Sequence, residues 1–452
     1  MTSEELAPVV PLRPMPGAVP GSGTWCCELD LADAAPPHGV VPLGAHGLAR
    51  ALVRLHGEPL GYLTAPVGPH GVDEAALRAR ARTVFAEAIA DHLDAEGLAV
   101  AAVDVPAGAP LPPAAAGCPN HVASDVRVTV VVCTRDRAAV LAGCLERLRA
   151  LTHPNLEILV VDNAPTDDST RAVVAAARER DDRVRHVVEP RPGLSAARNR
   201  GLAEARGAVL AYTDDDVAVD PDWVQGVLRG FGRGPAVVCV TGLVCTAAVD
   251  TPAEEYFDAR TALWSTRCTP ELFDLAEHRR DDPLYPYAPG LFGTGANLSF
   301  DRQVLLDLGG FDEALGAGTL TRGGEDLDVF VRVLRAGHGI AYEPAAVVWH
   351  HHRADDAALL RQLYGYGTGL SAYLTKCLLQ GGTRGEVLRR VLPGLRRRRR
   401  IAVETGERLG GGSGRAPAGA ARRELLGVAA GPVLYLRARW RARAASSVGP
   451  GR

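Results

Sequence analysis

Residues 126–352 alternate between two patterns of apolar positions. Short apolar runs rich in valine occupy residues 126–133, 156–161, 184–188 and 209–213, and the segments between them repeat apolar residues at helical spacing. Because the runs are almost continuously apolar, each predicts a strand buried on both faces. Strands and helices that alternate in this way predict an α/β fold, with a mostly parallel sheet and helices on both faces. In such sheets, ligands bind outside the carboxyl ends of the strands.

The residues before this region follow a different pattern. Residues 24–107 predict a small α+β module, with strands near residues 25–31, 48–55 and 59–64 and one long helix over residues 72–98. The module has no metal-spaced His/Cys cluster and no glycine-rich phosphate loop, so we expect a structural or partner-docking role.

Two stretches predict no packed structure. Residues 1–23 are rich in proline and glycine without periodicity, which predicts a disordered N-terminus. Residues 108–122 are rich in alanine, proline and glycine and predict a linker, so the α/β domain should cover residues 123–352.

Residues 353–452 predict a helical, basic C-terminal extension. They contain 20 Lys+Arg against 6 Asp+Glu, although the whole chain has a net charge of −3. Short apolar stretches flanked by arginines are typical of a peripheral helix on an anionic membrane surface, and a basic disordered terminus is the alternative. Aromatic residues make up 5% of the chain, which is sparse for base stacking, so we expect no nucleic acid partner.

The cysteines and the N-terminus indicate the compartment. Nine cysteines are scattered without a Cys-x-x-Cys pair, which favours reduced structural thiols and no zinc site. No signal peptide pattern is visible, and the longest apolar stretches fall short of the ~20 residues of a membrane-spanning helix. We expect a cytoplasmic protein, with the extension placing it on the inner face of the cell membrane.

Three adjacent carboxylates, Asp214, Asp215 and Asp216, follow the apolar run at residues 209–213. Like charges side by side raise one another's pKa, and a cation offsets this repulsion. Hard carboxylate oxygens suit Mg²⁺ or Mn²⁺. A solvated acidic turn is the alternative, and the buried strand in front of the triplet favours the metal.

Other polar residues follow the predicted strands. Thr134, Arg135 and Arg137 come after the first strand, where a dinucleotide-binding fold would need a glycine-rich loop. Asp162 ends the second strand and is placed to accept hydrogen bonds from a base or ribose. Arg198 lies in a later helix that starts with small residues. Each of these could serve as a helix cap or surface pair, but together they line one edge of one sheet.

Six motifs then occur in the order of a known family. They are Val-Val-Val-Cys-Thr-Arg-Asp-Arg, Val-Val-Asp-Asn, Gly-Leu-Ser-Ala-Ala-Arg-Asn-Arg-Gly, Tyr-Thr-Asp-Asp-Asp, Gly-Thr-Gly-Ala-Asn and Gly-Glu-Asp-Leu-Asp. This order resembles the family 2 glycosyltransferases with a GT-A fold, in an actinobacterial type with an additional N-terminal module. The resemblance covers residues 126–352 and reaches neither the N-terminal module nor most of the extension.

The resemblance implies a role for each matching residue. A metal site of Mn²⁺ or Mg²⁺ would be held by Asp214, Asp216 and His350, the first of three histidines at a strand end. His352 is the alternative ligand, because alternate residues of a strand share a face. Asp326 would act as the general base, with Glu325 beside it. The implied nucleotide-binding residues are Thr134, Arg135, Arg137, Asp162, Arg198 and Asp214, and the loop that borders donor sugar and acceptor comprises Gly295, Ala296 and Asn297.

The resemblance also implies the reaction. An inverting, metal-dependent enzyme would move a sugar from a nucleoside-diphosphate donor to a hydroxyl of a glycan, lipid-linked or small-molecule acceptor. A nucleotidyltransferase is one alternative, but such an enzyme usually has a glycine-rich, lysine-bearing segment after the first strand, where this sequence has Thr134-Arg-Asp-Arg. A glycosidase is another alternative, but its reaction releases no diphosphate whose charge would require the acidic triplet. A non-catalytic sugar-nucleotide-binding scaffold is the third alternative, and the intact carboxylates argue against it.

Overall fold

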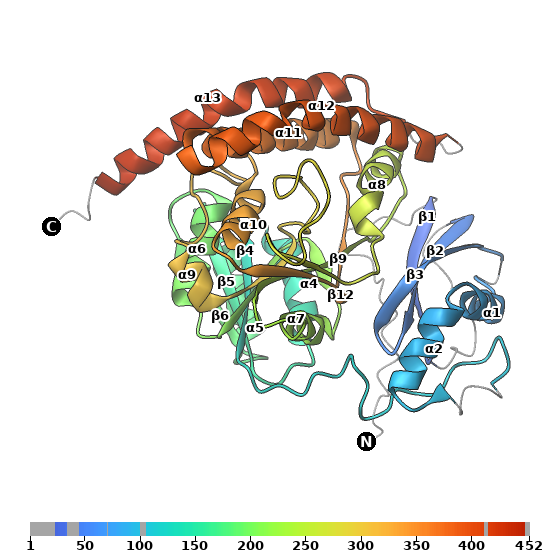
Figure 1. The fold of residues 1–452 in the computed structure, drawn as a ribbon. Coiled ribbons are helices and arrows are strands. Elements are labelled where there is room, and N and C mark those ends of the chain that lie inside the picture. The colour runs from blue at the N-terminus through green and yellow to red at the C-terminus, as the bar shows by residue number, and fades with distance from the viewer. Residues whose placement is uncertain (1–22, 34–44, 70, 100–104, 411–414, 448–452) are drawn as a thin grey trace.

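The computed structural model describes residues 23–33, 45–69, 71–99, 105–410 and 415–447, with side chains up to residue 441. The predicted disorder of residues 1–22 lies outside the described residues. Figure 1 shows an α/β domain at the centre, a small module beside it and long C-terminal helices across it.

The central sheet contains nine of the described strands, in the order β10-β12-β9-β11-β7-β4-β5-β6, with β8 alongside β12. Their bounds are β4 (Val128–Thr134), β5 (Leu156–Asn163), β6 (Val184–Glu189), β7 (Val209–Asp214), β8 (Val217–Val219), β9 (Val237–Thr246), β10 (Glu271–Phe273), β11 (Asn297–Asp301) and β12 (Gly339–His350). The predicted α/β fold with a mostly parallel sheet is confirmed.

The register of the sheet brings distant polar residues to one edge. The neighbouring pairs β4–β5, β5–β6 and β4–β7 are parallel, and β12 is parallel to β9. Since β11 runs antiparallel between β7 and β9, all of these parallel strands end on the same side. Thr134 therefore pairs with Asp162, and Cys133 pairs with Asp214. β11 begins at this edge, because Asn297 pairs with Thr213.

Helices cover both faces because successive strand residues point to opposite sides. Val130 and Val132 of β4 pack into one core with α4 (Ala138–Arg149), α5 (Ser169–Arg178) and α7 (Trp223–Phe231). Val131 packs into the other core with α6 (Leu194–Glu204), α9 (Arg302–Asp307) and α10 (Glu325–Arg335). Both cores end at the polar edge.

The N-terminal module has its own three-stranded sheet of β1 (Thr24–Asp30), β2 (Leu48–Leu55) and β3 (Glu58–Pro66), in that order. The prediction of one long helix is wrong, because the chain forms α1 (Glu74–Val84) and α2 (Ala86–Ala95) with a break at Phe85. The Phe85 ring occupies the space beside Gly61, where an added Cβ would lie 2.6 Å from the ring. Packing of this ring on β3 overrides the helical propensity of the alanine-rich segment.

The module docks on the α/β domain through buried contacts. Arg54 of β2 lies 2.5 Å from Asp220, and Arg50 makes a bidentate pair with Asp258 of α8 (Pro252–Ser265) at 2.7 and 2.9 Å. Leu52 joins an apolar cluster with Trp349 of β12. The module therefore supports the strand that ends at His350.

Three helices form the C-terminal extension: α11 (Asp356–Leu379), α12 (Gly381–Leu409) and α13 (Ala420–Ser447). The alternative of a disordered basic terminus does not hold for this described part. A Cβ on Gly367 of α11 would lie 2.3 Å from the Glu424 carbonyl of α13, so glycine lets the two backbones touch. None of the described helices combines the length and apolar content needed to cross a membrane.

Candidate active site at the carboxyl edge of the sheet

The acidic triplet stands where β7 ends and β8 begins, and its three carboxylates have different surroundings. Burial raises the pKa of Asp214 to about 6, although Arg198 opposes the rise. Burial likewise raises the pKa of Asp215 to about 6 against the charge of Arg137. For Asp216 burial also favours the neutral form, but His350 and Arg137 outweigh it and lower the pKa. Asp216 is therefore the carboxylate that stays charged most readily.

Asp215 is fixed by protein groups on both oxygens. Thr134 donates its hydroxyl to Oδ2 at 2.7 Å, and Arg137 donates to Oδ1 at 2.5 Å. The same guanidinium reaches Asp216 Oδ2 at 3.0 Å. Thr134 and Arg137, both predicted to bind nucleotide, thus hold the triplet in place, and Arg137 keeps a side chain that is 39% exposed.

Asp216 and His350 approach each other at the end of β12. His350 Nε2 lies 3.7 Å from Asp216 Oδ1, and Arg353 lies 3.7 Å from Oδ2. Burial lowers the pKa of His350 against the charge of Asp216, and Arg353 and Arg137 add to the lowering, which favours the neutral imidazole that a metal ligand requires. His352 lies beyond the end of β12 at His350, and its Nε2 contacts the Thr246 hydroxyl at 3.0 Å.

This pair fits a divalent cation. A gap of 3.7 Å suits two ligands of one ion, since two bonds of about 2.1 Å would span it. Carboxylate and imidazole suit Mn²⁺ or Mg²⁺. Asp214 does not complete a group of three: among the described residues, the one set of at least three such side chains that converges within 4.8 Å lies in the N-terminal module. Further ligands would come from substrate phosphate and water.

Arg198 is the centre of the site. Its guanidinium lies 3.2 Å from Glu325 Oε1, 3.6 Å from Asp214 Oδ1 and 2.9 Å from the Gly295 carbonyl. The side chain is 2% exposed. The resemblance implies a nucleotide-binding role for Arg198, and in the structure its guanidinium connects the triplet, the loop and the second carboxylate pair.

Glu325 and Asp326 open α10 at the same place. Burial and the charge of Asp326 raise the pKa of Glu325 against the opposing charge of Arg198. Its Oε2 is buried and has no hydrogen-bond partner in the described structure. Asp326 is half-buried, and its oxygens accept from the backbone N–H groups of Leu327 at 2.8 Å and Gly295 at 3.1 Å. The carboxylate predicted as general base is therefore held in a fixed orientation.

The loop before β11 closes the site. An added Cβ on Gly295 would lie 3.1 Å from the Arg198 guanidinium, so a larger residue would push against it. Ala296 packs against one of the two cores. Asn297 is buried, accepts from the Trp223 indole at 2.9 Å and donates to the Ala346 carbonyl at 2.7 Å. These hydrogen bonds hold the side chain of Asn297 in the protein interior, so it anchors the loop and does not face the other residues of the site.

The nucleotide end of the site contains Asp162. Its Oδ2 lies 3.3 Å from His186 Nε2, and its Oδ1 is buried without a hydrogen-bond partner among the described residues. An unsatisfied buried acceptor is costly, and a donor group of a ligand would satisfy it. Arg135 is exposed and pairs only weakly with Asp136, at 3.8 Å.

Two residues of the site escaped sequence reasoning. Arg353 directly follows the three histidines, so its place next to Asp216 could have been inferred from that adjacency. His186 lies inside β6, and no signal in the sequence connects it with Asp162.

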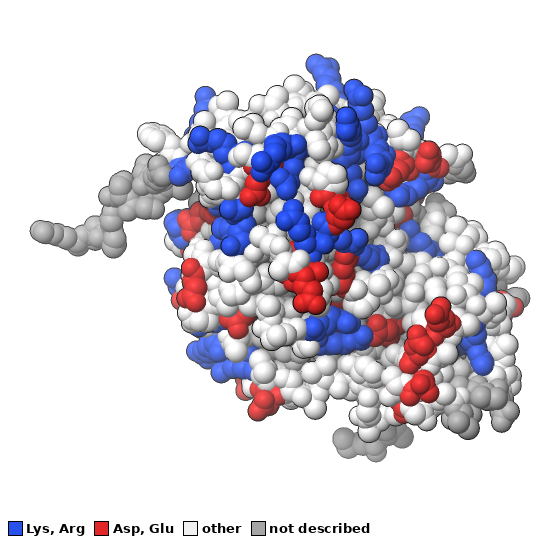
Figure 2. Space-filling view, viewed as in Figure 1, with Lys and Arg blue, Asp and Glu red and all other residues white. Residues whose placement is uncertain are grey.

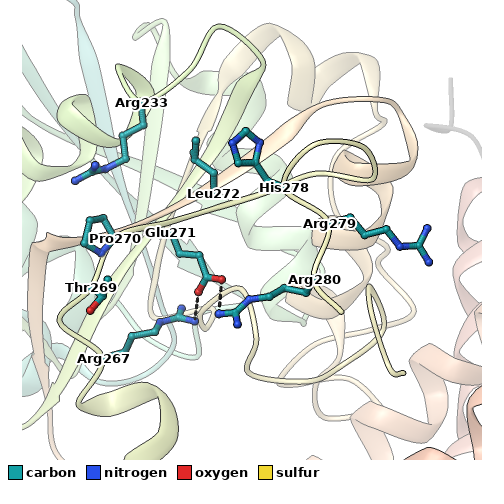
Figure 3. A pocket seen from close by; sticks show the side chains of 9 residues that line it. All are labelled: Arg233, Arg267, Thr269, Pro270, Glu271, Leu272, His278, Arg279 and Arg280. Carbon is teal, nitrogen blue, oxygen red and sulfur yellow. Dashed lines mark hydrogen bonds and ion pairs between the residues drawn. The ribbon is translucent and has the colours of Figure 1, made fainter. Parts of the chain in front are cut away.

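A pocket of about 890 Å³ lies elsewhere, at β10. Figure 3 shows Arg267 and Arg280 both reaching Glu271 in its wall. Because β10 pairs with the first residues of β12, this pocket lies at the opposite end of that strand from His350. None of the predicted site residues lines it.

Comparison with known proteins matches the α/β domain. Residues 129–287 match the family described as Glycosyl transferase family 2. A pre-mycofactocin glycosyltransferase of Mycobacterium tuberculosis is 28% identical over 270 residues, which are 59% of this chain and 49% of the relative. A glucosyl-dolichyl phosphate glucuronosyltransferase of Haloferax volcanii is 28% identical over 229 residues, 50% of this chain and 69% of the relative. The chain spans about half the length of the mycobacterial relative.

Among solved structures, the mannosyltransferase PcManGT from Pyrobaculum calidifontis, in complex with GDP-Man and Mn²⁺, is similar with a TM-score of 0.43 and 20% identity. The similarity covers 81% of this chain and 98% of that one. The match over residues 129–287 agrees with the family predicted from the motifs: this part of the chain is similar to the family 2 glycosyltransferases.

Proposed function

We propose that this protein is an inverting, metal-dependent glycosyltransferase that moves a sugar from a nucleoside diphosphate to a hydroxyl acceptor. The acceptor is a glycan, a lipid-linked saccharide or a small molecule. The observation that carries the proposal is the convergence on Arg198 of the acidic triplet, through Asp214, and of the pair Glu325-Asp326. Two carboxylate groups gathered around one charged centre suit a leaving diphosphate and an entering hydroxyl.

Each part of the site then has a task. Asp216 and His350 would hold Mn²⁺ or Mg²⁺, which neutralises the charge of the leaving diphosphate. Asp162 accepts a hydrogen bond from the nucleoside, and Arg137 stands at the exposed side of the triplet. Asp326 takes the proton of the acceptor hydroxyl as that oxygen bonds to the anomeric carbon and the bond to the diphosphate breaks. Arg198 positions the carboxylates around the reacting sugar.

A donor screen tests this function. We expect one of the UDP-, GDP- or dTDP-sugars to be slowly hydrolysed in Mn²⁺ and to raise the melting temperature. Asp326→Asn should retain the thermal shift and lose hydrolysis and transfer by at least a factor of about 100, the usual range of a general base. Asp168→Asn makes the same change at a side chain that is 88% exposed and should leave both measurements unaltered.

The screen also separates the alternatives. A nucleotidyltransferase would release pyrophosphate from a nucleoside triphosphate, and a scaffold would bind a sugar nucleotide with no turnover under any condition. Full transfer by Asp326→Asn would place the base elsewhere. The stereochemistry is read from the anomeric configuration of the product, and a retained configuration would contradict a single displacement.

We further propose that α12 and α13 lie against an anionic membrane on its cytoplasmic side. Leu388, Val391, Leu392 and Leu395 recur at helical spacing on α12 and are 52–61% exposed. On α13, Val433, Leu436 and Trp440 are 50–72% exposed. Figure 2 shows arginines gathered over these helices. Exposed apolar stripes flanked by arginines suit lipid tails and anionic headgroups together.

Liposome sedimentation tests this surface. The protein should sediment with phosphatidylglycerol vesicles at low salt and much less with neutral vesicles. Leu392→Glu combined with Trp440→Glu should abolish sedimentation. Leu306→Glu, on α9 and 37% exposed, is the matched control and should sediment like the wild type. Equal sedimentation of all three proteins would refute the proposed surface.

A further inference from the structure

Four side chains that suit a transition metal converge in the N-terminal module. They are His56, His92, Glu96 and Cys118, and their ligand atoms all lie within 4.8 Å of one another. His56 Nδ1 and His92 Nε2 lie 2.6 and 2.7 Å from Glu96 Oε1, and 3.2 Å from each other. Cys118 Sγ lies 3.8 Å from His92 Nε2. Nothing in the glycosyltransferase site uses this group.

The fold positions each of the four. His56 stands in the two-residue turn between β2 and β3 with φ 51°, and its side chain is 1% exposed although hairpin turns usually face water. His92 and Glu96 are four residues apart and project from the same face of α2 and its end. Cys118 belongs to the segment predicted as a linker, which packs on the module through Leu111. The Glu96 side chain has no exposed surface.

Hydrogen bonds orient the ligand atoms inward. His56 Nε2 lies 2.8 Å from the Pro112 carbonyl, which can only accept, so Nε2 carries the proton and the lone pair of neutral His56 is on Nδ1. Glu96 Oε2 accepts from the Ala115 N–H at 2.7 Å, which leaves Oε1 facing the histidines. Backbone partners of this kind fix ligands in metal sites. Nδ1 of His56 and Oε1 of Glu96 therefore face each other 2.6 Å apart, and both are atoms that can bind a metal ion.

We propose that His56, His92, Glu96 and Cys118 bind one Zn²⁺ ion as a closed structural site. Imidazole, thiolate and carboxylate are the zinc ligands of proteins, and four protein ligands leave no open position. Tetrahedral zinc with bonds of about 2.0–2.3 Å separates its ligands by about 3.3–3.7 Å. The contacts of 2.6–3.8 Å lie around this value, so small movements of Glu96 would admit the ion.

The proton balance follows from the thiol. Zinc binds a thiolate, so the Cys118 thiol would release its proton to solvent as the sulfur–zinc bond forms. The ion would join the hairpin turn, the end of α2 and the following segment. Such a cross-link would stabilise the module, because a small domain has only a modest hydrophobic core. Residue spacing gave no sign of this site, because His56 and Cys118 lie 36 and 26 residues from His92 along the chain.

Metal analysis of the purified full-length protein tests the proposal. We expect about one zinc ion per chain in the wild type, and loss of zinc in Cys118→Ser and in His92→Gln. Two matched controls, Cys268→Ser and His278→Gln, change half-buried or exposed residues outside the cluster and should retain zinc. Asp216→Asn should also retain it, which separates this site from the metal of the proposed reaction.

A second measurement starts from the wild type, whose folding is unaffected by any substitution. Replacement of zinc by Co²⁺ in the wild type should give the intense visible bands of tetrahedral cobalt and a sulfur-to-cobalt charge-transfer band. The charge-transfer band should be absent from Cys118→Ser. Wild-type protein that contains no zinc after expression in zinc-supplemented medium, and shows no tetrahedral cobalt spectrum, would overturn the proposal. The result would then be a proton-sharing cluster only.

Discussion

Replacement of Arg198 by methionine tests the centre of the site. Methionine keeps most of the length and removes the charge, so Glu325 and Asp214 lose their shared cation. Removal of one partner from a buried ion pair costs about 3–5 kcal/mol. Protonation limits this loss, because the pKa of Glu325 is already raised to about 7 in the wild type and the carboxyl takes up a proton readily at neutral pH. We expect about 1–3 kcal/mol of destabilisation at pH 7, the cost of leaving buried polar groups without their partner.

The pH dependence has a defined sign. Without Arg198, the pKa of Glu325 in the folded protein rises further above its unfolded value, so the folded state binds the additional proton. Both folded proteins bind this proton below about pH 7, where the pKa of Glu325 in the wild type lies, so the stability difference between them should be smallest there and should grow as pH rises above 7. Each pH unit above 7 adds up to about 1.36 kcal/mol, until the pKa of Glu325 in the variant is reached.

Urea unfolding of a double-mutant cycle at pH 6 and pH 9 measures these terms. Glu325→Gln in the Arg198→Met background removes the unpaired carboxylate and should recover most of the loss at pH 9. The wild type and Glu325→Gln complete the cycle. If Arg198→Met loses the same free energy of unfolding at both pH values, or if Glu325→Gln recovers nothing, the buried ion pair is not what holds this site together.

Three further substitutions test single contacts. Thr134→Val removes the hydroxyl bonded to Asp215 and should lower the free energy of unfolding by about 1–3 kcal/mol in urea titrations; an unchanged midpoint would contradict this. Asp162→Ala should weaken nucleoside-diphosphate binding at least about tenfold in calorimetry with little change in melting temperature, and wild-type affinity would exclude its role. Gly226→Ala would place a Cβ 2.4 Å from the Ala346 nitrogen and should cost about 1–3 kcal/mol, whereas Gly406→Ala, with open space around it, should not destabilise the protein.

The strand ends could be predicted because one pattern carries both the fold and the chemistry. Continuous valine runs mark buried parallel strands, and the first polar residue after each run must stand at the carboxyl edge. Thr134, Asp162 and Asp214 were located in this way, and their register in the sheet agrees. His350 follows from the same reasoning at the end of β12.

Side-chain partners could not be predicted, since they depend on tertiary distances. No pattern of residues indicates that Arg198 is buried against Glu325, or that Asn297 accepts a hydrogen bond from Trp223. The break at Phe85 depends on the space beside Gly61, which lies on another strand. The four candidate zinc ligands have no regular spacing, so only the folded module brings them together.

Calorimetric binding of the nucleoside diphosphate selected by the donor screen, with Mn²⁺ present or omitted, tests the central claim most directly. Wild-type protein and the exposed control Asp168→Asn should bind at least about tenfold more tightly with Mn²⁺, and Asp216→Asn should lose that difference, because the ion joins the carboxylate to the diphosphate. Equal affinity of the wild type with and without Mn²⁺, or a full Mn²⁺ effect in Asp216→Asn, would contradict a metal held at this edge of the sheet.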